Sequence, residues 1–143
     1  MKLVQSRLLV IAQIVCIVLM GRHWNRVEYT PFIIALLTLS AAPGAWALAT
    51  LNRHMSIFPE PKAGAVLVTT GPFKFVRHPM YTTLIFGGSI FVAYGDLVTL
   101  ASWLILIGVL IAKVSFEEKL LTQTFENYAD YQKHTKKFIP FLF

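Results

Sequence analysis

Charged side chains are scarce in this chain of 143 residues, since aspartate, glutamate, lysine and arginine together make up only 14% of it. A soluble domain carries roughly a quarter of its residues as charged ones. Hydrophobic residues, in contrast, account for 56% of the chain. The shortage of charge therefore points to a lipid bilayer as the main solvent of this protein.

Cysteine is almost absent, because Cys16 is the only one. A single cysteine excludes an intrachain disulfide and a metal site built on cysteine pairs, and we predict no metal site. Cys16 lies in an apolar run, where a small buried core residue is the simplest interpretation. Acidic residues are also few, which leaves a formal net charge of +6. No motif typical of nucleic-acid binding accompanies that charge, so we attribute it to loops facing an anionic leaflet and expect no nucleic-acid partner.

What the chain has instead is four apolar stretches, each close to the roughly 20 residues that cross a bilayer as a helix. They predict membrane spans at about 3–20, 32–51, 79–95 and 97–116. Pro43 and Gly44 interrupt the second stretch, where proline is expected to kink the helix. Only Gly95 and Asp96 separate the last two stretches, and so short a link predicts an antiparallel helical hairpin. We therefore predict an all-α polytopic membrane bundle, formed by one domain over residues 1–143.

Basic residues indicate how this bundle is oriented. With four spans, the N-terminus, the middle loop and the C-terminal tail lie on one side of the membrane. That side holds Lys2, Arg7, Arg53, Lys62, Lys74, Arg77, Lys119, Lys133, Lys136 and Lys137, whereas the other side holds Arg22 and Arg26. The excess predicts that both termini are cytoplasmic, in a plasma (inner) membrane. Lys113, near the end of the fourth span, is expected to snorkel to the same side.

The cytoplasmic tail at 117–143 is predicted to be largely helical. Residues 115–136 contain no proline or glycine, and apolar residues recur there at helical spacing. This pattern predicts an amphipathic helix that either continues the fourth span or lies on the membrane surface.

Ionisable side chains cluster at the start of the third span, in residues 71–81 (GPFKFVRHPMY). Because such groups are expensive to desolvate at a membrane, a cluster of them indicates a functional site. Both arms of the predicted hairpin are about 25–30 Å long at 1.5 Å per residue, so His78 is expected at the depth of Glu117 and Glu118. Taken singly, Arg77 could be a headgroup anchor, and the two glutamates a solvated helix face.

Taken together, these residues favour a ligand of mixed charge. Pro79 opens a helix, and the free N–H groups at such a helix end favour an anionic group. Glu117 and Glu118 offer acceptors to a cation or to sugar hydroxyls. A molecule with a carboxylate, an amine, a ribose and a positive centre would suit this site.

Three motifs in order resemble the hallmarks of the isoprenylcysteine carboxyl methyltransferase and phospholipid methyltransferase superfamily. They are residues 68–81 (VTTGPFKFVRHPMY), 117–121 (EEKLL) and 125–131 (FENYADY) followed by 139–141 (IPF), and residues 52–56 and 59–61 resemble the segment ahead of them. The resemblance covers about residues 51–141. It implies an integral membrane methyltransferase that uses S-adenosylmethionine and acts on a lipid or prenylated acceptor.

The resemblance also implies roles for particular residues. The cofactor would be bound by His78, Tyr81, Glu117 and Glu118, with backbone groups near Thr70 and Gly71. Arg77 would orient the cofactor or an acidic group of the substrate. From the chemistry of the reaction we expect His134 or one of the two glutamates, Glu117 or Glu118, to take the proton from an amine or thiol acceptor, whereas a carboxylate acceptor needs no base.

The chain departs from the family pattern at three positions. Thr83 stands where a small residue is common, Glu126 replaces a frequent glycine, and His134 takes the place of an arginine found in the prenylcysteine branch. Histidine lacks the bidentate fork with which arginine grips a carboxylate. Two alternative functions stay open: a nicotinamide-dependent membrane reductase of the sterol type, and a non-catalytic scaffold with the same fold.

Overall fold

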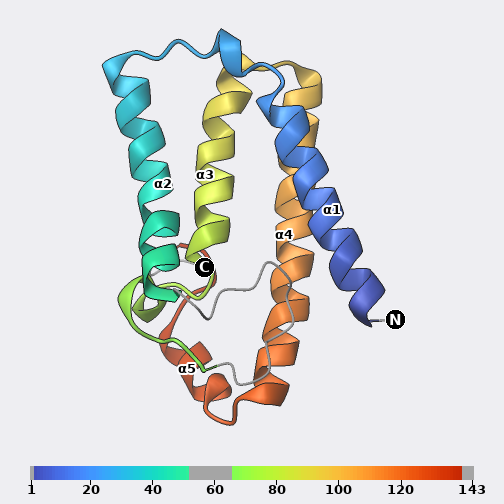
Figure 1. Ribbon diagram of the computed structural model, residues 1–143, viewed down its shortest axis with the longest axis vertical. Helices are drawn as coiled ribbons and strands as arrows, with labels where there is room; N and C mark the ends of the chain where they lie inside the picture. The colour runs from blue at the N-terminus through green and yellow to red at the C-terminus, as the bar shows by residue number, and fades with distance from the viewer. Residues whose placement is uncertain (1, 52–65, 140–143) are drawn as a thin grey trace.

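A computed structural model describes residues 2–51 and 66–139 of the chain. Four long helices run side by side: α1 (Lys2–Gly21), α2 (Pro31–Leu51), α3 (Pro79–Tyr94) and α4 (Leu97–Thr124). A short helix, α5 (Tyr128–His134), lies at one end, and the 3-10 turns η1 (Trp24–Arg26) and η3 (Gly71–Lys74) lie in the connections (Figure 1). The predicted all-α bundle is confirmed. The resemblance at 52–56, 59–61 and 140–141 falls outside the described residues.

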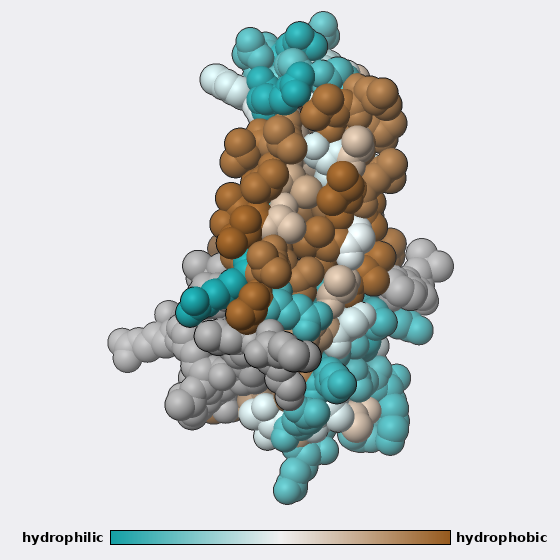
Figure 2. Space-filling model, turned by 90° about the vertical axis from the view of Figure 1, so that its right-hand side faces the viewer, coloured by the Kyte–Doolittle hydropathy of each residue, from teal (hydrophilic) through white to brown (hydrophobic). Residues whose placement is uncertain are grey.

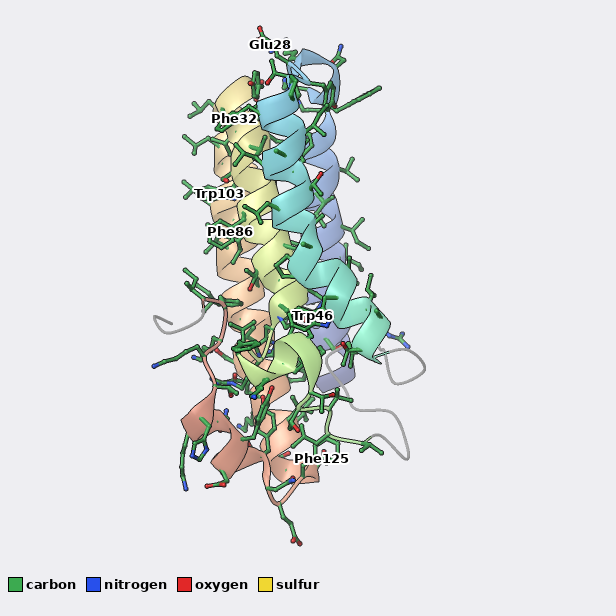
Figure 3. The ribbon with its side chains drawn as sticks, turned by 90° about the vertical axis from the view of Figure 1, so that its left-hand side faces the viewer. Glu28, Phe32, Trp46, Phe86, Trp103 and Phe125 are labelled. Atoms are coloured by element: carbon green, nitrogen blue, oxygen red, sulfur yellow. The ribbon has the colours of Figure 1, made fainter. Side chains whose placement is uncertain are left out.

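Three of the described helical segments are long and apolar enough to cross a membrane: Val4–Arg26, Pro31–Leu51 and Leu97–Thr124. Helix α3 has 16 residues, which is shorter than the other three, but it lies beside them along the bundle (Figure 1). Figure 2 shows a broad apolar surface between two hydrophilic ends. Figure 3 places Glu28 and Phe125 at opposite ends, with Phe32, Trp103, Phe86 and Trp46 between them. The protein is therefore an integral membrane protein.

The helices of the bundle contact one another most extensively in two pairs, α1 with α4 and α2 with α3. Cys16 and Met20 of α1 are buried against Leu106 and Leu110 of α4, which confirms Cys16 as a small core residue. The Trp103 indole donates to the carbonyl of Ile85 at 2.9 Å and so ties the arms of the hairpin together. The α1–α4 core and this hydrogen bond together join α1, α3 and α4.

The hairpin turn is held by Asp96, which caps α4. Its carboxylate accepts from the Thr99 N–H at 3.0 Å and completes a capping box. Arg22 and His23, at the end of α1, contact the same carboxylate at 2.7 and 3.2 Å. The pKa of the Asp96 carboxyl lies well below its ordinary value of 3.8. The main cause is the hydrogen bond from the Thr99 N–H, and His23 and Arg22 add to it.

Replacing Asp96 by asparagine measures how much the carboxylate charge contributes to stability. Asparagine also caps helices well, so the substitution removes the charge and keeps the cap. Since folding lowers the pKa of Asp96, its stabilising effect is present above about pH 4 and is lost as the pH falls through the depressed pKa. The stability gap between wild type and Asp96→Asn should therefore be largest above pH 4 and shrink in more acidic buffer. Urea unfolding in detergent at several pH values measures this difference in stability. A difference that grows in acid would contradict the lowered pKa of Asp96.

Helix α2 continues through Pro43, although proline cannot supply the usual N–H. The Gly44 N–H, one residue on, donates to Thr83 Oγ1 of α3 at 2.9 Å. Thr83, one of the three departures from the family pattern, thus accepts a hydrogen bond from a backbone N–H group next to the proline. Gly44 is buried, and a Cβ there would lie 2.7 Å from Thr83 Oγ1.

Substituting Gly44 by alanine is expected to destabilise the protein by about 1–3 kcal/mol, since the methyl group would overpack the α2–α3 contact. Gly108→Ala is the matched control, because a Cβ at Gly108 has nothing within 4 Å. That helical substitution should be neutral or stabilising by up to about 1 kcal/mol. Thermal unfolding of both variants in detergent distinguishes them, and equal midpoints would argue against close packing at Gly44.

The tail differs from the single helix predicted over 115–136. Helix α4 continues to Thr124, as one of the two interpretations proposed, but the chain then turns at Phe125 and α5 begins at Tyr128. Phe125 has extended backbone angles, with φ −120° and ψ 116°. A straight helix would have carried the tail away from the bundle, whereas the turn returns it to the start of α3.

Candidate functional site

The start of α3 and the end of α4 bring an imidazole and two carboxylates together. His78 is the residue before the first turn of α3, and its Nε2 lies 3.3 Å from Glu118 Oε1. Its Nδ1 lies 3.7 Å from Glu117 Oε2. The Tyr81 hydroxyl donates to the same Glu117 oxygen at 3.0 Å, and the Tyr81 ring stacks on His78 with centroids 5.4 Å apart. The proximity predicted from the equal hairpin arms is confirmed.

Arg77 forms a buried ion pair with Glu118. The guanidinium Nε donates to Glu118 Oε1 at 2.7 Å, and the two side chains are only 8% and 11% exposed. The second carboxylate oxygen of Glu118 accepts from Gln132 Nε2 at 3.2 Å. Both oxygens of Glu118 are therefore occupied by side chains of the protein.

The C-terminal strap, residues 135–138, crosses the beginning of α3. The backbone N–H groups of Arg77 and His78 donate to the carbonyls of Lys136 and Lys137 at 2.8 and 3.0 Å. The Lys136 N–H donates in turn to the Phe75 carbonyl at 3.2 Å, which gives a parallel bridge between Val76 and Lys136. The strap thus pairs with the motif through backbone hydrogen bonds.

Side chains reinforce this attachment. Arg77 Nη1 donates to the carbonyl of Gln132 at 3.2 Å and to both the carbonyl and the hydroxyl of Thr135. The Thr82 hydroxyl donates to the Phe138 carbonyl at 2.7 Å. Arg77 therefore links the strap to α4, a bracing task that the sequence did not predict.

The three remaining predicted site residues, Thr70, Gly71 and His134, have other surroundings in the structure. Gly71 opens η3 with φ 61°, and a Cβ there would lie 2.5 Å from Thr50 Oγ1, so this turn packs closely against α2. Thr70 precedes it and is exposed. His134 is also exposed, and its Nδ1 donates to the carbonyl of Asp130 in its own helix at 3.0 Å. The roles predicted for Thr70, Gly71 and His134 stay predictions.

Lys113 is a member of the site that the sequence placed wrongly. Instead of snorkelling to the surface it is buried, with 3% exposure. Its Nζ donates to Gln13 Oε1 of α1 at 2.8 Å and lies 5.1 Å from the centre of the Tyr81 ring. An amide oxygen and an aromatic face inside the bundle replace the water that snorkelling would have provided. The signal was its position four residues before Glu117, which puts both on one helix face.

Two further members, Gln132 and Thr135, were missed because nothing in their local pattern marks them. Both contact the Arg77–Glu118 pair from the tail. The tail is anchored again by Tyr131, whose hydroxyl donates to the Phe73 carbonyl at 2.6 Å. Burial raises the pKa of Tyr131 to about 12, so this donor keeps its proton at neutral pH.

The charges in the site are balanced but not equally accessible. Arg77 and Lys113 face Glu117 and Glu118. Glu118 is paired with Arg77 and nearly buried, whereas the Glu117 side chain is 24% exposed and contacts the Tyr81 hydroxyl. Glu117 is thus the carboxylate that a ligand can reach. Within residues 2–51 and 66–139, no group of three or more His, Cys, Asp or Glu side chains is arranged to hold a metal ion.

Comparison with known proteins identifies related chains. The profile of a family described as phospholipid methyltransferase matches residues 27–128. A nickel-cobalt-cadmium resistance protein of Alcaligenes xylosoxydans xylosoxydans is 31% identical over 134 residues, which cover 92% of this chain and 62% of that protein. A cobalt-zinc-cadmium resistance protein of Cupriavidus metallidurans is 26% identical over 121 residues, covering 82% and 54%. The chain thus spans little more than half the length of these relatives.

Proposed function

Because the chain belongs to the phospholipid methyltransferase family, we propose that it transfers a methyl group from S-adenosylmethionine to a lipid or prenylated acceptor at the membrane surface. The observation that carries this proposal is the cluster in which Glu117 and Glu118 of α4 meet His78 and Tyr81 of α3 under the strap. The cluster lies at the end of apolar helices, where a lipophilic acceptor and a polar cofactor can meet.

The residues of the cluster fit this cofactor by their chemistry. When bound, S-adenosylmethionine supplies a methyl group activated by a positively charged sulfur. Its cationic groups and ribose hydroxyls call for acceptors, and Glu117 offers a partly exposed carboxylate that the Tyr81 hydroxyl holds in place. His78 is held between the two carboxylates, so its ring orientation is fixed.

Catalysis in this site would depend mainly on alignment. Holding two reactants in the right geometry can contribute roughly 7–11 kcal/mol to lowering a barrier. Arg77 would act indirectly in this reaction. It holds Glu118 and the strap in place, and Glu117 is left to face the ligand. For an amine or thiol acceptor we propose that Glu117 rather than His134 takes the proton. Glu117 lies in the cluster, whereas His134 is exposed and contacts a carbonyl of its own helix.

The test is methyl transfer by the full chain in detergent or lipid nanodiscs. S-adenosylmethionine with a labelled methyl group is incubated with a native membrane lipid extract, and the labelled product is identified by mass spectrometry. Label in an extractable lipid is the expected result. Thermal protection by NADPH and not by S-adenosylmethionine would favour the reductase instead. Cofactor binding without any transfer would favour the scaffold.

We also infer that the site faces the cytoplasm. The start of α1 and helix α5 lie at the same end of the bundle (Figure 1), which supports the predicted topology with both termini on one side. Lys74, Lys119, Lys133 and Lys136 lie at this end and are exposed. Attachment of a small, membrane-impermeant thiol-reactive dye to cysteines introduced at Lys133 and Asn25 in intact cells tests the orientation. Labelling only at position 25 is expected, because that residue belongs to the opposite end.

A role in metal tolerance is a second proposal, carried by the relatives, which are named for resistance to nickel, cobalt, cadmium and zinc. We infer that methylation of a membrane component by this chain supports growth in the presence of such metals. A host without the gene should regain cobalt or nickel tolerance when the wild-type chain is expressed. Failure of Glu117→Gln to restore tolerance would tie the effect to the site, and equal rescue by this variant would separate the two proposals.

A further inference from the structure

A buried hydroxyl without a partner lies beside the cluster. The Tyr128 side chain is 1% exposed, and its hydroxyl has no hydrogen-bond partner among the described residues. Leaving a buried hydroxyl unpaired is unfavourable, and most buried polar groups in proteins are paired. A group kept in this condition therefore calls for an explanation.

The neighbouring hydroxyls of the tail behave differently. The Tyr131 hydroxyl, one turn along α5, donates to the Phe73 carbonyl at 2.6 Å. The Thr135 hydroxyl donates to the Tyr131 carbonyl at 2.7 Å. The Ser6 hydroxyl is also unpaired in the described part of the chain, but it lies on the face of α1 that is packed into the apolar bundle. Tyr128 is the unpaired group that stands at the site.

The surroundings of Tyr128 are charged. Burial first, and then the charge of Glu118, raise the pKa of the Tyr128 phenol, while Arg77 opposes the effect. The hydroxyl therefore keeps its proton and is available as a donor. Its ring is packed against that of Tyr131, with centroids 5.8 Å apart, so the side chain is held in place.

We propose that the Tyr128 hydroxyl is a further ligand-binding group of this site and donates a hydrogen bond to a polar atom of a nucleoside-bearing methyl donor. The inference rests on the proposed function. The cofactor is favoured over the acceptor because α5 lies beyond the apolar part of the helices, at a hydrophilic end of the molecule (Figures 1 and 2). A lipid acceptor would approach from the apolar belt.

The experiment is Tyr128→Phe in the full chain, purified in detergent and titrated with S-adenosylhomocysteine, the demethylated product of the cofactor. Removal of an unpaired hydroxyl costs the ligand-free protein nothing, so its unfolding temperature should be unchanged or raised. Binding should weaken about three- to tenfold, the loss of one hydrogen bond to the ligand. In Tyr128→Phe the affinity for S-adenosylhomocysteine should therefore fall while the unfolding temperature stays the same or rises.

Tyr131→Phe is the matched control, because it removes a paired hydroxyl from the same helix. This variant should unfold at a lower temperature, since the Phe73 carbonyl loses its donor. A comparable loss of stability in Tyr128→Phe would show that its hydroxyl has a partner within the protein and would overturn the inference. Unchanged binding in Tyr128→Phe would also overturn it. If wild type itself did not bind the product, the cofactor assignment would fail, and this inference with it.

Discussion

Replacing Arg77 by alanine should lower the free energy of unfolding by about 3–5 kcal/mol, the cost of removing one partner of a buried ion pair. The substitution leaves the Glu118 carboxylate nearly buried without its cation. It also removes the donor that contacts Gln132 and Thr135, so the tail loses its main side-chain anchor. Denaturant unfolding in detergent measures the first effect. Faster proteolysis within residues 132–139 reports the second.

The control for Arg77 is Lys133→Ala. Lys133 pairs with Asp130 at 3.2 Å, but both side chains are 71% exposed, and such surface pairs contribute at most about 1 kcal/mol. A double variant, Arg77→Met with Glu118→Leu, removes both charges at once and should recover much of the lost stability. Its recovery would show that the penalty comes from the unpaired charge. An Arg77→Ala protein as stable as wild type would refute the bracing role.

Replacing Glu117 by glutamine is expected to weaken S-adenosylmethionine binding about 10- to 100-fold, the range for losing a hydrogen bond to a charged group. Glutamine keeps the size of the side chain and still accepts from the Tyr81 hydroxyl, so only the charge is lost. Isothermal titration calorimetry in detergent measures the affinity. Methyl transfer should fall at least in proportion, since our proposal also assigns to Glu117 the removal of the proton from an amine or thiol acceptor.

Glu126→Gln serves as the matched control for Glu117, because it makes the same change at an exposed position between α4 and α5. Its affinity for the cofactor should equal that of wild type. Both variants should unfold near the wild-type temperature, which separates a binding defect from a folding defect. Unaltered cofactor affinity in Glu117→Gln would remove Glu117 from the binding site.

The core of the site could be predicted because it depends on simple lengths. The two-residue link at Gly95 and Asp96 commits the last two helices to a hairpin, and the rise of an α-helix then sets His78 level with Glu117. Hydrophobic runs marked the helices themselves. The predicted starts and ends of α3 agree with the structure to within one residue, because a proline and a Gly-Asp turn bound that segment.

What the sequence did not predict depends on polar partners that are far away along the chain. The role of Arg77 in orienting a ligand stays a prediction, but its contacts with residues 41 and 58 positions further on were not predicted. Lys113 was expected at the surface, yet Gln13, 100 residues earlier, provides its acceptor inside the bundle. The sequence around Arg77 or Lys113 does not indicate which distant residues they contact.

The sequence by itself determined a membrane bundle with a hairpin that brings an imidazole and two glutamates to one face. Burial of apolar side chains follows periodicity and length, which are properties of a single segment. Only the tertiary structure decided which glutamate is paired with Arg77 and which stays accessible, where the tail turns, and that His134 is exposed. Hydrogen bonds and ion pairs act over about 3 Å and depend on orientation, so they are set only when separate segments have packed together.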